Sequence, residues 1–458
     1  MQDQPLRVAI VGSGPSGFYA AEALFKIGRN VHVAIFERFP TPFGLVRFGV
    51  APDHAKIRNV IHVYEKTAAQ GAFAYFGNVT IGRDLSVDEL RGCFDAVIFA
   101  FGSETDRRLG IPGEDLPRSY TATEFCAWYN GHPDYRNRSF DLSQKTAVVV
   151  GQGNVAMDVA RILAKPPEEL RCTDMASHAC EALAQSRVRD IYVVGRRGPA
   201  QAAFTPKEIA ELGEIDGCDI FVNPDDLALN PASEAELKLP DAAANNRNME
   251  TLREFAARKP TGAPKRLFIR FFQSPIEIRG HGAVESVVLE KNQLSGEPGK
   301  QQARGTGVTE VLPCGILFRS IGYRGLPIPG IPFDEKKCVI PNDRGRASPG
   351  LYAVGWIKRG PSGLIGTNKK DSEETVQRLL EDAPNLPPAP RRDDRDLLQL
   401  LEARGVRVVT FADWRRIDRA EVERGKLLGK PRDNFTTVAQ MLTALDRQPT
   451  PAAEPGVG

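Results

Sequence analysis

Two short glycine-rich motifs, about 140 residues apart, constrain this chain more than any other feature of it. Each follows an apolar run and precedes an amphipathic stretch, the pattern of a strand, a tight turn and a helix. In such a unit the first glycine permits the bend, the second lets backbone approach a pyrophosphate, and the third position packs the helix on the strand. The motifs are Gly12, Ser13, Gly14, Pro15, Ser16 and Gly17, and Gly151, Gln152, Gly153, Asn154, Val155 and Ala156. We therefore expect one protein that holds two nucleotides, each with its phosphates at a helix N-terminus.

The strand after each motif indicates which nucleotide is held there. Glu37 ends an apolar run about 20 residues after the first motif, where a carboxylate accepts the ribose hydroxyls. Because that carboxylate repels a 2′-phosphate, the first site suits FAD or NAD. The matching run of the second unit ends in Arg196 and Arg197, and guanidinium groups bind phosphate through charge-assisted hydrogen bonds. This pattern favours NADP, although paired arginines are also common on solvated turns, and the stretch 166–187 lengthens the usual spacing.

Composition limits the class of protein. The chain has 458 residues, of which 41% are hydrophobic and 26% charged, as in a globular protein of two or three domains. Its formal net charge of +2 argues against a general nucleic-acid binder. We expect a cytoplasmic protein, because no signal or transit peptide precedes the first apolar strand. We also expect no membrane span, because no apolar run is long enough to cross a bilayer.

The seven cysteines form no C-x-x-C pair. Their spacing therefore predicts neither an iron–sulfur cluster nor a zinc site, and we expect no bound metal. A disulfide reductase would place a redox dithiol beside its flavin, so that class is excluded as well. Reduced thiols fit a cytoplasmic protein.

The remaining apolar runs predict the order of the elements. A buried strand at 94–102 completes the first unit, a strand at 315–323 returns from the second, and a strand at 349–356 leads to a helix near 371–380. Residues 267–278 and 283–289 are expected to form antiparallel strands. The predicted fold class is α/β, with two dinucleotide-binding, Rossmann-like domains and the NADP domain inserted into a discontinuous FAD domain. The expected domains are 1–105 with 321–458 for FAD, and 106–320 for NADP.

Five segments carry a resemblance to a known family, namely residues 11–17, 41–54, 151–156, 194–199 and 355–361. The most distinctive are the part of the second segment that begins at Gly44 and the Gly-Trp-Ile-Lys-Arg-Gly-Pro run of the last. In these segments the chain resembles the adrenodoxin-reductase type of ferredoxin–NADP reductase, essentially end to end. The resemblance implies that hydride passes from NADPH to FAD, and that single electrons then pass to a small iron–sulfur protein.

The resemblance also implies which residues contact the cofactors. Those expected to contact FAD are Gly12, Ser13, Gly14, Pro15, Ser16, Gly17, Glu37, Leu45, Ile81, Trp356, Gly363, Leu364 and Ile365. Those expected to contact NADP are Arg107, Gln152, Gly153, Asn154, Val155, Arg196, Arg197, Glu208 and Gly363.

A histidine–glutamate pair is a further implication of the resemblance, and here it would be His54 with Glu211. We expect this pair to orient the nicotinamide, whereas a lone histidine without the family pattern more often has a structural role. Trp356 stands where related flavoproteins carry an acid, and it either covers the flavin or serves as a core aromatic residue. Asp158 is expected to be a surface or packing residue of its helix.

An acidic ferredoxin, the expected partner, would need a basic docking face. The candidates are Lys26, Arg29, Arg247, Arg253, Arg258, Lys259, Lys265 and Arg266, each of which could equally be a solvated charge. Two other functions remain open at this point. A flavin monooxygenase would insert oxygen into an organic substrate, and a non-catalytic NADP-sensing protein would lack a flavin.

Overall fold

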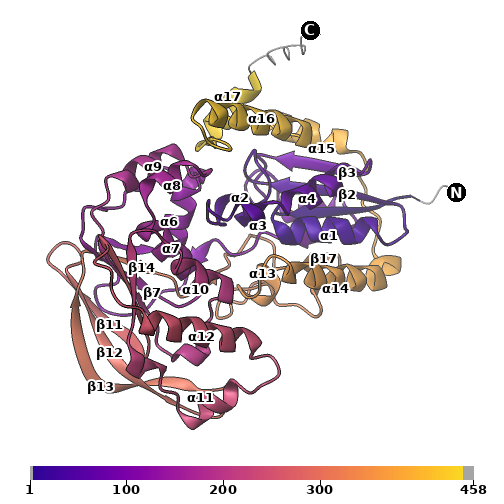
Figure 1. Cartoon of the computed structure of the whole chain (residues 1–458). Helices are drawn as coiled ribbons and strands as arrows, with labels where there is room; N and C mark the ends of the chain where they lie inside the picture. Colours follow the sequence, from indigo (N-terminus) through magenta and orange to yellow (C-terminus); the bar gives the residue numbers. More distant parts are fainter. Residues whose placement is uncertain (1–3, 447–458) are drawn as a thin grey trace, which may run out of the picture.

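The computed structural model describes residues 4–446 and contains two six-stranded sheets (Figure 1). The first sheet has the order β16-β17-β4-β1-β2-β3, and its neighbouring strands are parallel except for the pair β16–β17. Its strands are β1 (Leu6–Val11), β2 (Val31–Glu37), β3 (Phe73–Gly77), β4 (Ala96–Phe99), β16 (Arg346–Ser348) and β17 (Leu351–Ala353). Both ends of the chain therefore build one sheet.

Helices cover both faces of this first sheet. Val8 and Ile10 pack with α1 and α14 on one face, while Ala9 and Val11 pack with α5 and α15 on the other, as the period of two in a strand requires. The C-terminal helices lie beside the sheet at the top of Figure 1. The helices are α1 (Pro15–Phe25), α2 (Leu45–Phe48), α3 (Ala55–Arg58), α4 (Ile61–Ala68), α5 (Val87–Arg91), α13 (Trp356–Arg359), α14 (Thr367–Asp382), α15 (Asp394–Ala403), α16 (Phe411–Leu427) and α17 (Val438–Asp446).

The second sheet is wholly parallel and has the order β6-β14-β7-β8-β10-β9. Its strands are β6 (Ser119–Thr121), β7 (Thr146–Val150), β8 (Asp190–Val194), β9 (Cys218–Val222), β10 (Lys265–Arg270) and β14 (Ile316–Arg319). The helices of this part are α6 (Ala122–Tyr129), α7 (Asn154–Ala164), α8 (Pro167–Arg171), α9 (Ser177–Ala184), α10 (Pro206–Leu212), α11 (Pro231–Glu236) and α12 (Ala243–Ala257). The short helices α8 and α9 account for the long spacing before β8. The predicted class, α/β with two Rossmann-like units, is confirmed.

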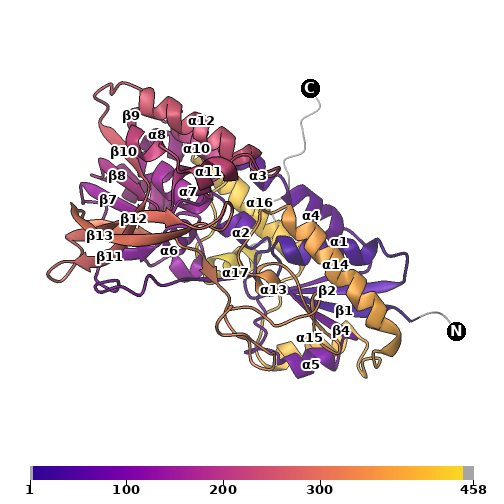
Figure 2. The same ribbon diagram turned by 90° about the horizontal axis from the view of Figure 1, so that it is seen from below.

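A small antiparallel sheet covers one face of the second sheet. It consists of β11 (Gln273–Arg279), β12 (Ser286–Ser295) and β13 (Gln302–Pro313). Its buried residues Val287, Leu289 and Leu312 pack against Val148 and Leu317 of the parallel sheet. Figure 2 shows the three strands beside β7 and β8.

The expectation of a single antiparallel strand at 267–278 is wrong. The chain breaks at Phe272, which has a φ of 54°. The part before the break is β10, which pairs in parallel with β8 and β9, and only the part after it, β11, is antiparallel to a neighbour. Because apolar residues continue across the break, the sequence gives no signal of it.

The chain passes between the two large sheets twice, and the two crossings lie side by side. Asp106 of β5 (Thr105–Asp106) pairs with Tyr323 of β15 (Tyr323–Arg324) in a two-stranded antiparallel ribbon. We propose domain boundaries at 1–105 with 321–458, and at 106–320, and this ribbon supports them. None of the helices between residues 4 and 446 is both long and apolar enough to cross a membrane.

Candidate functional site

Both glycine motifs form a strand, a turn and the start of a helix. Gly14 is the N-cap of α1 and Gly153 is the N-cap of α7, and no described side chain caps either helix. A Cβ atom at either glycine would meet nothing within 4 Å. Each helix therefore begins with uncapped N–H groups beside open space, which suits the phosphates of a nucleotide.

The first glycine of each motif is required by its backbone. Gly12 has a φ of 106° and Gly151 a φ of 134°, a region that favours glycine. A Cβ atom at Gly12 would lie 2.7 Å from the carbonyl of Ala100, and one at Gly151 would lie 2.0 Å from the carbonyl oxygen of Ser320. Any side chain would push the strand next to the turn away.

Glu37 lies at the end of β2, beside the start of α1. One carboxylate oxygen accepts hydrogen bonds from the hydroxyl of Ser13 at 2.6 Å and from its backbone N–H at 3.2 Å. The other oxygen accepts from the N–H of Phe39 at 3.1 Å. The carboxylate is thus fixed beside the start of α1, and its charge disfavours a 2′-phosphate there.

Arg196 and Arg197 follow β8, and both side chains are exposed. Among residues 4–446, no carboxylate lies within 4.0 Å of either guanidinium. Although the Arg197 side chain is exposed, partial desolvation and the neighbouring charge of Arg196 lower its pKa. Their carbonyls accept hydrogen bonds from the Asn292 side chain at 2.9 Å and from the Phe272 N–H at 3.0 Å, so the backbone is held while the charges are free for a ligand.

The other residues of the second motif hold the turn in place. Gln152 donates from Nε2 to the carbonyl of Arg270 at 3.0 Å, and Asn154 accepts at Oδ1 from the N–H of Thr205 at 2.8 Å. Val155 is half-buried and packs on the core. These contacts join α7 to β10 and to the segment that leads into α10.

Trp356 lies at the start of α13, which packs on the first motif. A Cβ atom at Gly355 would lie 2.0 Å from the hydroxyl oxygen of Ser16, so the two helix starts touch. The indole Nε1 of Trp356 donates to the carbonyl of Ser362 at 3.2 Å, and the ring lies 5.1 Å from that of Tyr323. The residue is half-buried rather than a core aromatic.

The remaining residues expected to contact the cofactors differ in exposure. Leu45 and Leu364 are exposed apolar side chains, 37% and 60% accessible, whereas Ile81 is buried. Arg107 is exposed on the crossing, where its N–H donates to the Gly322 carbonyl at 2.9 Å. Exposed leucines beside a nucleotide motif suit contact with an apolar ring system. The helix expected near 371–380 is α14, and it already begins at Thr367, beyond Gly363 and Ile365.

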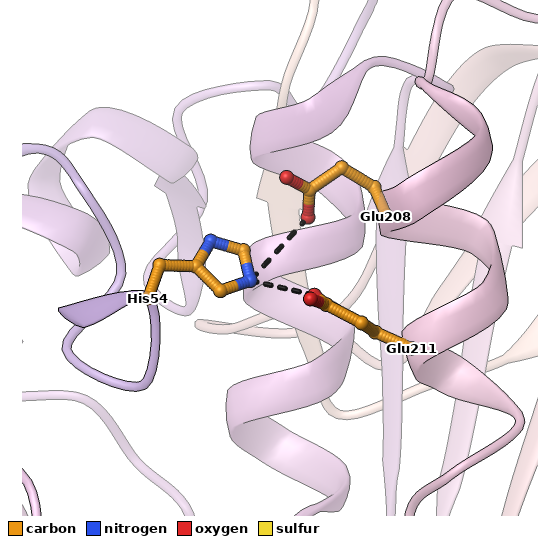
Figure 3. Close-up of side chains that lie close together, drawn as sticks. All are labelled: His54, Glu208 and Glu211. Carbon is orange, nitrogen blue, oxygen red and sulfur yellow. Dashed lines mark hydrogen bonds and ion pairs between the residues drawn. The ribbon is translucent and has the colours of Figure 1, made fainter. Parts of the chain in front are cut away.

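His54 and Glu211 lie together although they are far apart in the sequence (Figure 3). The imidazole Nε2 of His54 and the Oε2 of Glu211 are 2.6 Å apart, and Glu208 Oε2 is 3.8 Å from the same nitrogen. Both glutamates project from α10, which belongs to the part of the molecule with the second sheet, whereas His54 precedes α3, which belongs to the part with the first sheet. The pair therefore spans the two halves of the molecule.

Arg161 and Asp53, for which the sequence predicts no role, complete this cluster together with Asp158, which packs inside it. Arg161 of α7 is 1% exposed in its side chain and contacts Asp53 at 2.8 Å, Asp158 at 2.6 Å and Glu208 at 3.1 Å. Asp158 Oδ1 also lies 3.9 Å from His54 Nδ1. Asp158 is thus a buried member of an ion cluster and not a surface residue of its helix. The spacing of 158 and 161 on one helical face was the one available signal.

The cluster carries more acids than its cations neutralise, and the pKa values of the individual acids therefore differ. Burial and the charge of Asp158 raise the pKa of Glu208 to about 7, and burial also raises the pKa of Asp158 itself. Burial acts against ionisation of Glu211 too, but the hydrogen bond from His54 outweighs it and lowers the pKa. Glu211 is therefore the ionised partner, and His54 Nε2–H donates to it.

The same side chains have the donor types of a metal site. The ligand atoms of His54, Glu208 and Glu211 lie within 4.8 Å of one another. However, the guanidinium of Arg161 is 3.1 Å from Glu208 and 3.8 Å from Glu211, so a cation already lies beside both acids. We assign no metal to the cluster.

Comparisons with known proteins agree with this arrangement. A family model described as pyridine nucleotide-disulphide oxidoreductase matches residues 6–193. NADPH-ferredoxin reductase FprA of Mycobacterium leprae is 46% identical over 446 residues, which cover 95% of this chain and 97% of the relative. The mitochondrial NADPH:adrenodoxin oxidoreductase of Bos taurus is 44% identical, with 97% and 93% covered.

A solved structure extends the similarity to three dimensions. Mycobacterium tuberculosis FprA in complex with NADPH has a TM-score of 0.92 and 43% identity, and the match covers 97% of this chain and 100% of that one. The seven cysteines of the present chain are all unpaired in this structure. By its sequence and its fold, the chain belongs to the family of NADPH-ferredoxin reductases and NADPH:adrenodoxin oxidoreductases.

Proposed function

We propose that this protein carries electrons from NADPH, through FAD, to a ferredoxin-type iron–sulfur protein. It is an NADP-dependent flavoprotein oxidoreductase by family, and family membership favours the reductase over a flavin monooxygenase. When bound, FAD accepts a hydride from NADPH and supplies electrons singly, and the protein binds and orients the reactants. The observation that carries the proposal is the contrast between two uncapped helix starts. Glu37 lies beside one of them, and the other unit carries Arg196 and Arg197, which have no ion pair within residues 4–446.

The first motif is the proposed FAD site. Its N–H groups would bind the pyrophosphate, and Glu37 would exchange its bond with Ser13 for the ribose hydroxyls. The proposed contacts with the ring system are Leu45, Ile81, Trp356 and residues 363–365. Exposed Leu45 and Leu364, and the close packing of α13 on α1, support this placement.

The second motif is the proposed NADP site. Arg196 and Arg197 would bind the 2′-phosphate, because each guanidinium is exposed and lacks a carboxylate partner within the described part of the chain. Residues 152–155 would bind the pyrophosphate at the start of α7. Contacts of Arg107 and Glu208 with the nucleotide remain part of the proposal.

His54 and Glu211 are proposed to orient the nicotinamide. Hydride transfer needs no proton donor, so a role in positioning suits the pair better than acid–base catalysis. The ionised Glu211 holds the Nε2–H of His54 at 2.6 Å, which fixes the plane of the imidazole at the interface of the two halves.

An acidic ferredoxin is the proposed partner, and α12 is its proposed docking face. Arg247 and Arg253 of α12 are exposed and have no ion pair within residues 4–446. In contrast, Arg266 pairs with Asp190 at 2.6 Å, and Lys265 donates to a backbone carbonyl. The latter two lie at the amino ends of the parallel strands, away from the edge where a nucleotide binds.

A cytoplasmic location is also part of the proposal. It is supported by seven unpaired cysteines, five of which are buried thiols. Disulfides form and persist in oxidising compartments, so this cysteine usage suits a reducing one.

The decisive assay is the reduction of cytochrome c by NADPH through added ferredoxins from the source organism. A reductase gives turnover that depends on the ferredoxin, together with dye reduction in its absence. Oxidation of NADPH that rises with an organic substrate and consumes oxygen would instead identify a monooxygenase. Protein purified without a flavin that also fails to reduce ferricyanide would contradict both functions.

A further inference from the structure

Arg161 makes the most connected set of buried contacts in the His54 cluster. Its Nε and Nη2 atoms bind both oxygens of Asp53, at 2.8 and 3.1 Å. Its Nη2 also reaches Asp158 at 2.6 Å, and its Nη1 reaches Glu208 at 3.1 Å. All three nitrogens of the guanidinium are therefore engaged, each by a carboxylate.

These contacts join the two members of the proposed nicotinamide-orienting pair. Asp53 directly precedes His54, so the bidentate bond from Arg161 fixes the backbone that carries the imidazole. On the other side, Nη1 of Arg161 lies 3.1 Å from Glu208 and 3.8 Å from Glu211, both on α10. One buried side chain thus locates both ends of the 2.6 Å hydrogen bond.

Arg161 also sets the charge of the cluster. Burial raises the pKa of Asp53, but the hydrogen bonds from Arg161 outweigh this and hold the pKa below its usual value. Two further cations are near, since Lys165 lies 3.3 Å from Asp53 and Lys207 lies 3.3 Å from Glu211. Both lysines are more exposed than Arg161, so Arg161 is the buried cation of the cluster.

We propose that Arg161 is a positioning residue for hydride transfer. It touches neither nucleotide in this proposal and acts through Asp53, Glu208 and Glu211 on the orientation of His54. The proposal rests on the function proposed above for His54 and Glu211. A residue that holds reactants in place changes turnover more than affinity, because a small misplacement of reacting groups slows the reaction severely.

The test compares Arg161→Gln with a matched variant, Arg319→Gln. Arg319 is also buried, belongs to the same half of the molecule and pairs with the buried Glu114 at 2.5 Å, but it has no described contact with the His54 cluster. Both changes remove the nearest guanidinium partner of a buried carboxylate, so both are expected to lower stability. A loss of stability therefore does not separate the two variants, and the test depends on turnover and on the signal of His54.

Two measurements on the flavin-loaded enzyme separate the variants. We expect Arg161→Gln to lower kcat for ferricyanide reduction at least tenfold, with KM for NADPH changed less than threefold, whereas Arg319→Gln stays within twofold of the wild type. In the flavin-loaded enzyme without NADP, nitrogen NMR of labelled histidines reports the Nε2–H of His54. That signal should shift in Arg161→Gln and stay unchanged in Arg319→Gln. Arg161→Lys keeps the positive charge but cannot form the two parallel hydrogen bonds with Asp53, so its kcat should lie between those of Arg161→Gln and the wild type.

The outcomes distinguish the proposed role of Arg161 from the proposed role of His54 and Glu211. If His54→Gln and Glu211→Gln themselves leave kcat unchanged, the role of the pair is wrong. If those variants lose activity while Arg161→Gln keeps either kcat or the His54 signal, Arg161 is a structural ion-pair residue and the present proposal is overturned. Should Arg161→Gln fail to fold, Asp53→Asn removes the charge and one of the two hydrogen bonds beside His54 while Arg161 keeps its other acids, and the same criteria apply to it.

Discussion

Replacing both Arg196 and Arg197 by alanine should convert this enzyme from one that prefers NADPH into one that discriminates weakly between NADPH and NADH. The two guanidiniums are exposed and carry no described carboxylate partner, so their removal leaves no buried acid behind. The loss should therefore fall on nucleotide binding and not on the stability of the fold.

The size of the effect follows from the contacts that are lost. A hydrogen bond between charged groups contributes about 1.5–3 kcal/mol, and solvent exposure favours the lower end for each arginine. Together the two side chains should contribute about 3 kcal/mol, which corresponds to a fall of about 150-fold in kcat/KM for NADPH at 1.36 kcal/mol per tenfold. The change should appear mainly in KM, because the phosphate is remote from the reacting atoms.

Steady-state ferricyanide reduction with each nucleotide measures this loss. KM for NADH should stay within about threefold, since NADH has no phosphate at that position. Arg266→Ala is the matched control, because Arg266 is an exposed arginine at the opposite edge of the same sheet and is paired with Asp190 at 2.6 Å. A double variant that keeps its preference for NADPH would refute the assignment of this site.

Three further predictions concern the other parts of the molecule. Glu37→Ala should weaken FAD retention, measured as flavin absorbance after dialysis, and full retention would contradict the proposed ribose contact. Raising ionic strength to about 0.3 M, or reversing the charges of Arg247 and Arg253, should reduce ferredoxin-dependent cytochrome c reduction more than ferricyanide reduction; equal losses would exclude α12 as the docking face. In the folded protein the pKa of Glu208 is raised to about 7, whereas in the unfolded chain this carboxyl releases its proton near 4.5. The stability that the bound proton provides is therefore complete below pH 4.5 and is lost as the pH rises through 7. Glu208→Gln should flatten that fall when thermal unfolding is followed across this range, and an unchanged slope would contradict the assignment.

The elements that the sequence predicts well are those with a local cause. Gly12 and Gly151 occur where a strand must turn sharply into a helix, and the apolar run before each glycine is long enough to identify the strand. The break at Phe272 was missed because the apolar pattern continues through it, and only the pairing with β8 and β9 decides where the first strand ends.

The ion cluster could not be predicted from the sequence, for a different reason. Arg161 is separated from Asp53 by 108 positions and from Glu208 by 47, and in the sequence each is one charge among many. Arginine is rarely buried, so its residue type argues for the surface until its partners are known. The family resemblance identified His54, Glu208 and Glu211, but the contacts of Arg161 with Asp53 and Asp158 became evident only from the structure.

The pairing of β4 with β17 has a consequence for how such a chain can be built. These strands are parallel neighbours in the first sheet, with Phe99 opposite Ala353, although most of the chain lies between them. Parallel neighbours always need a crossover connection, for which a dozen or so residues suffice. Here the whole second sheet with its helices occupies that connection, and the ribbon of β5 and β15 brings its entrance and exit together. All strands of the host sheet therefore lie outside the insertion, β1 to β4 before it and β16 and β17 after it, so one crossover loop could be exchanged for an entire nucleotide-binding unit without a change in any strand of the host.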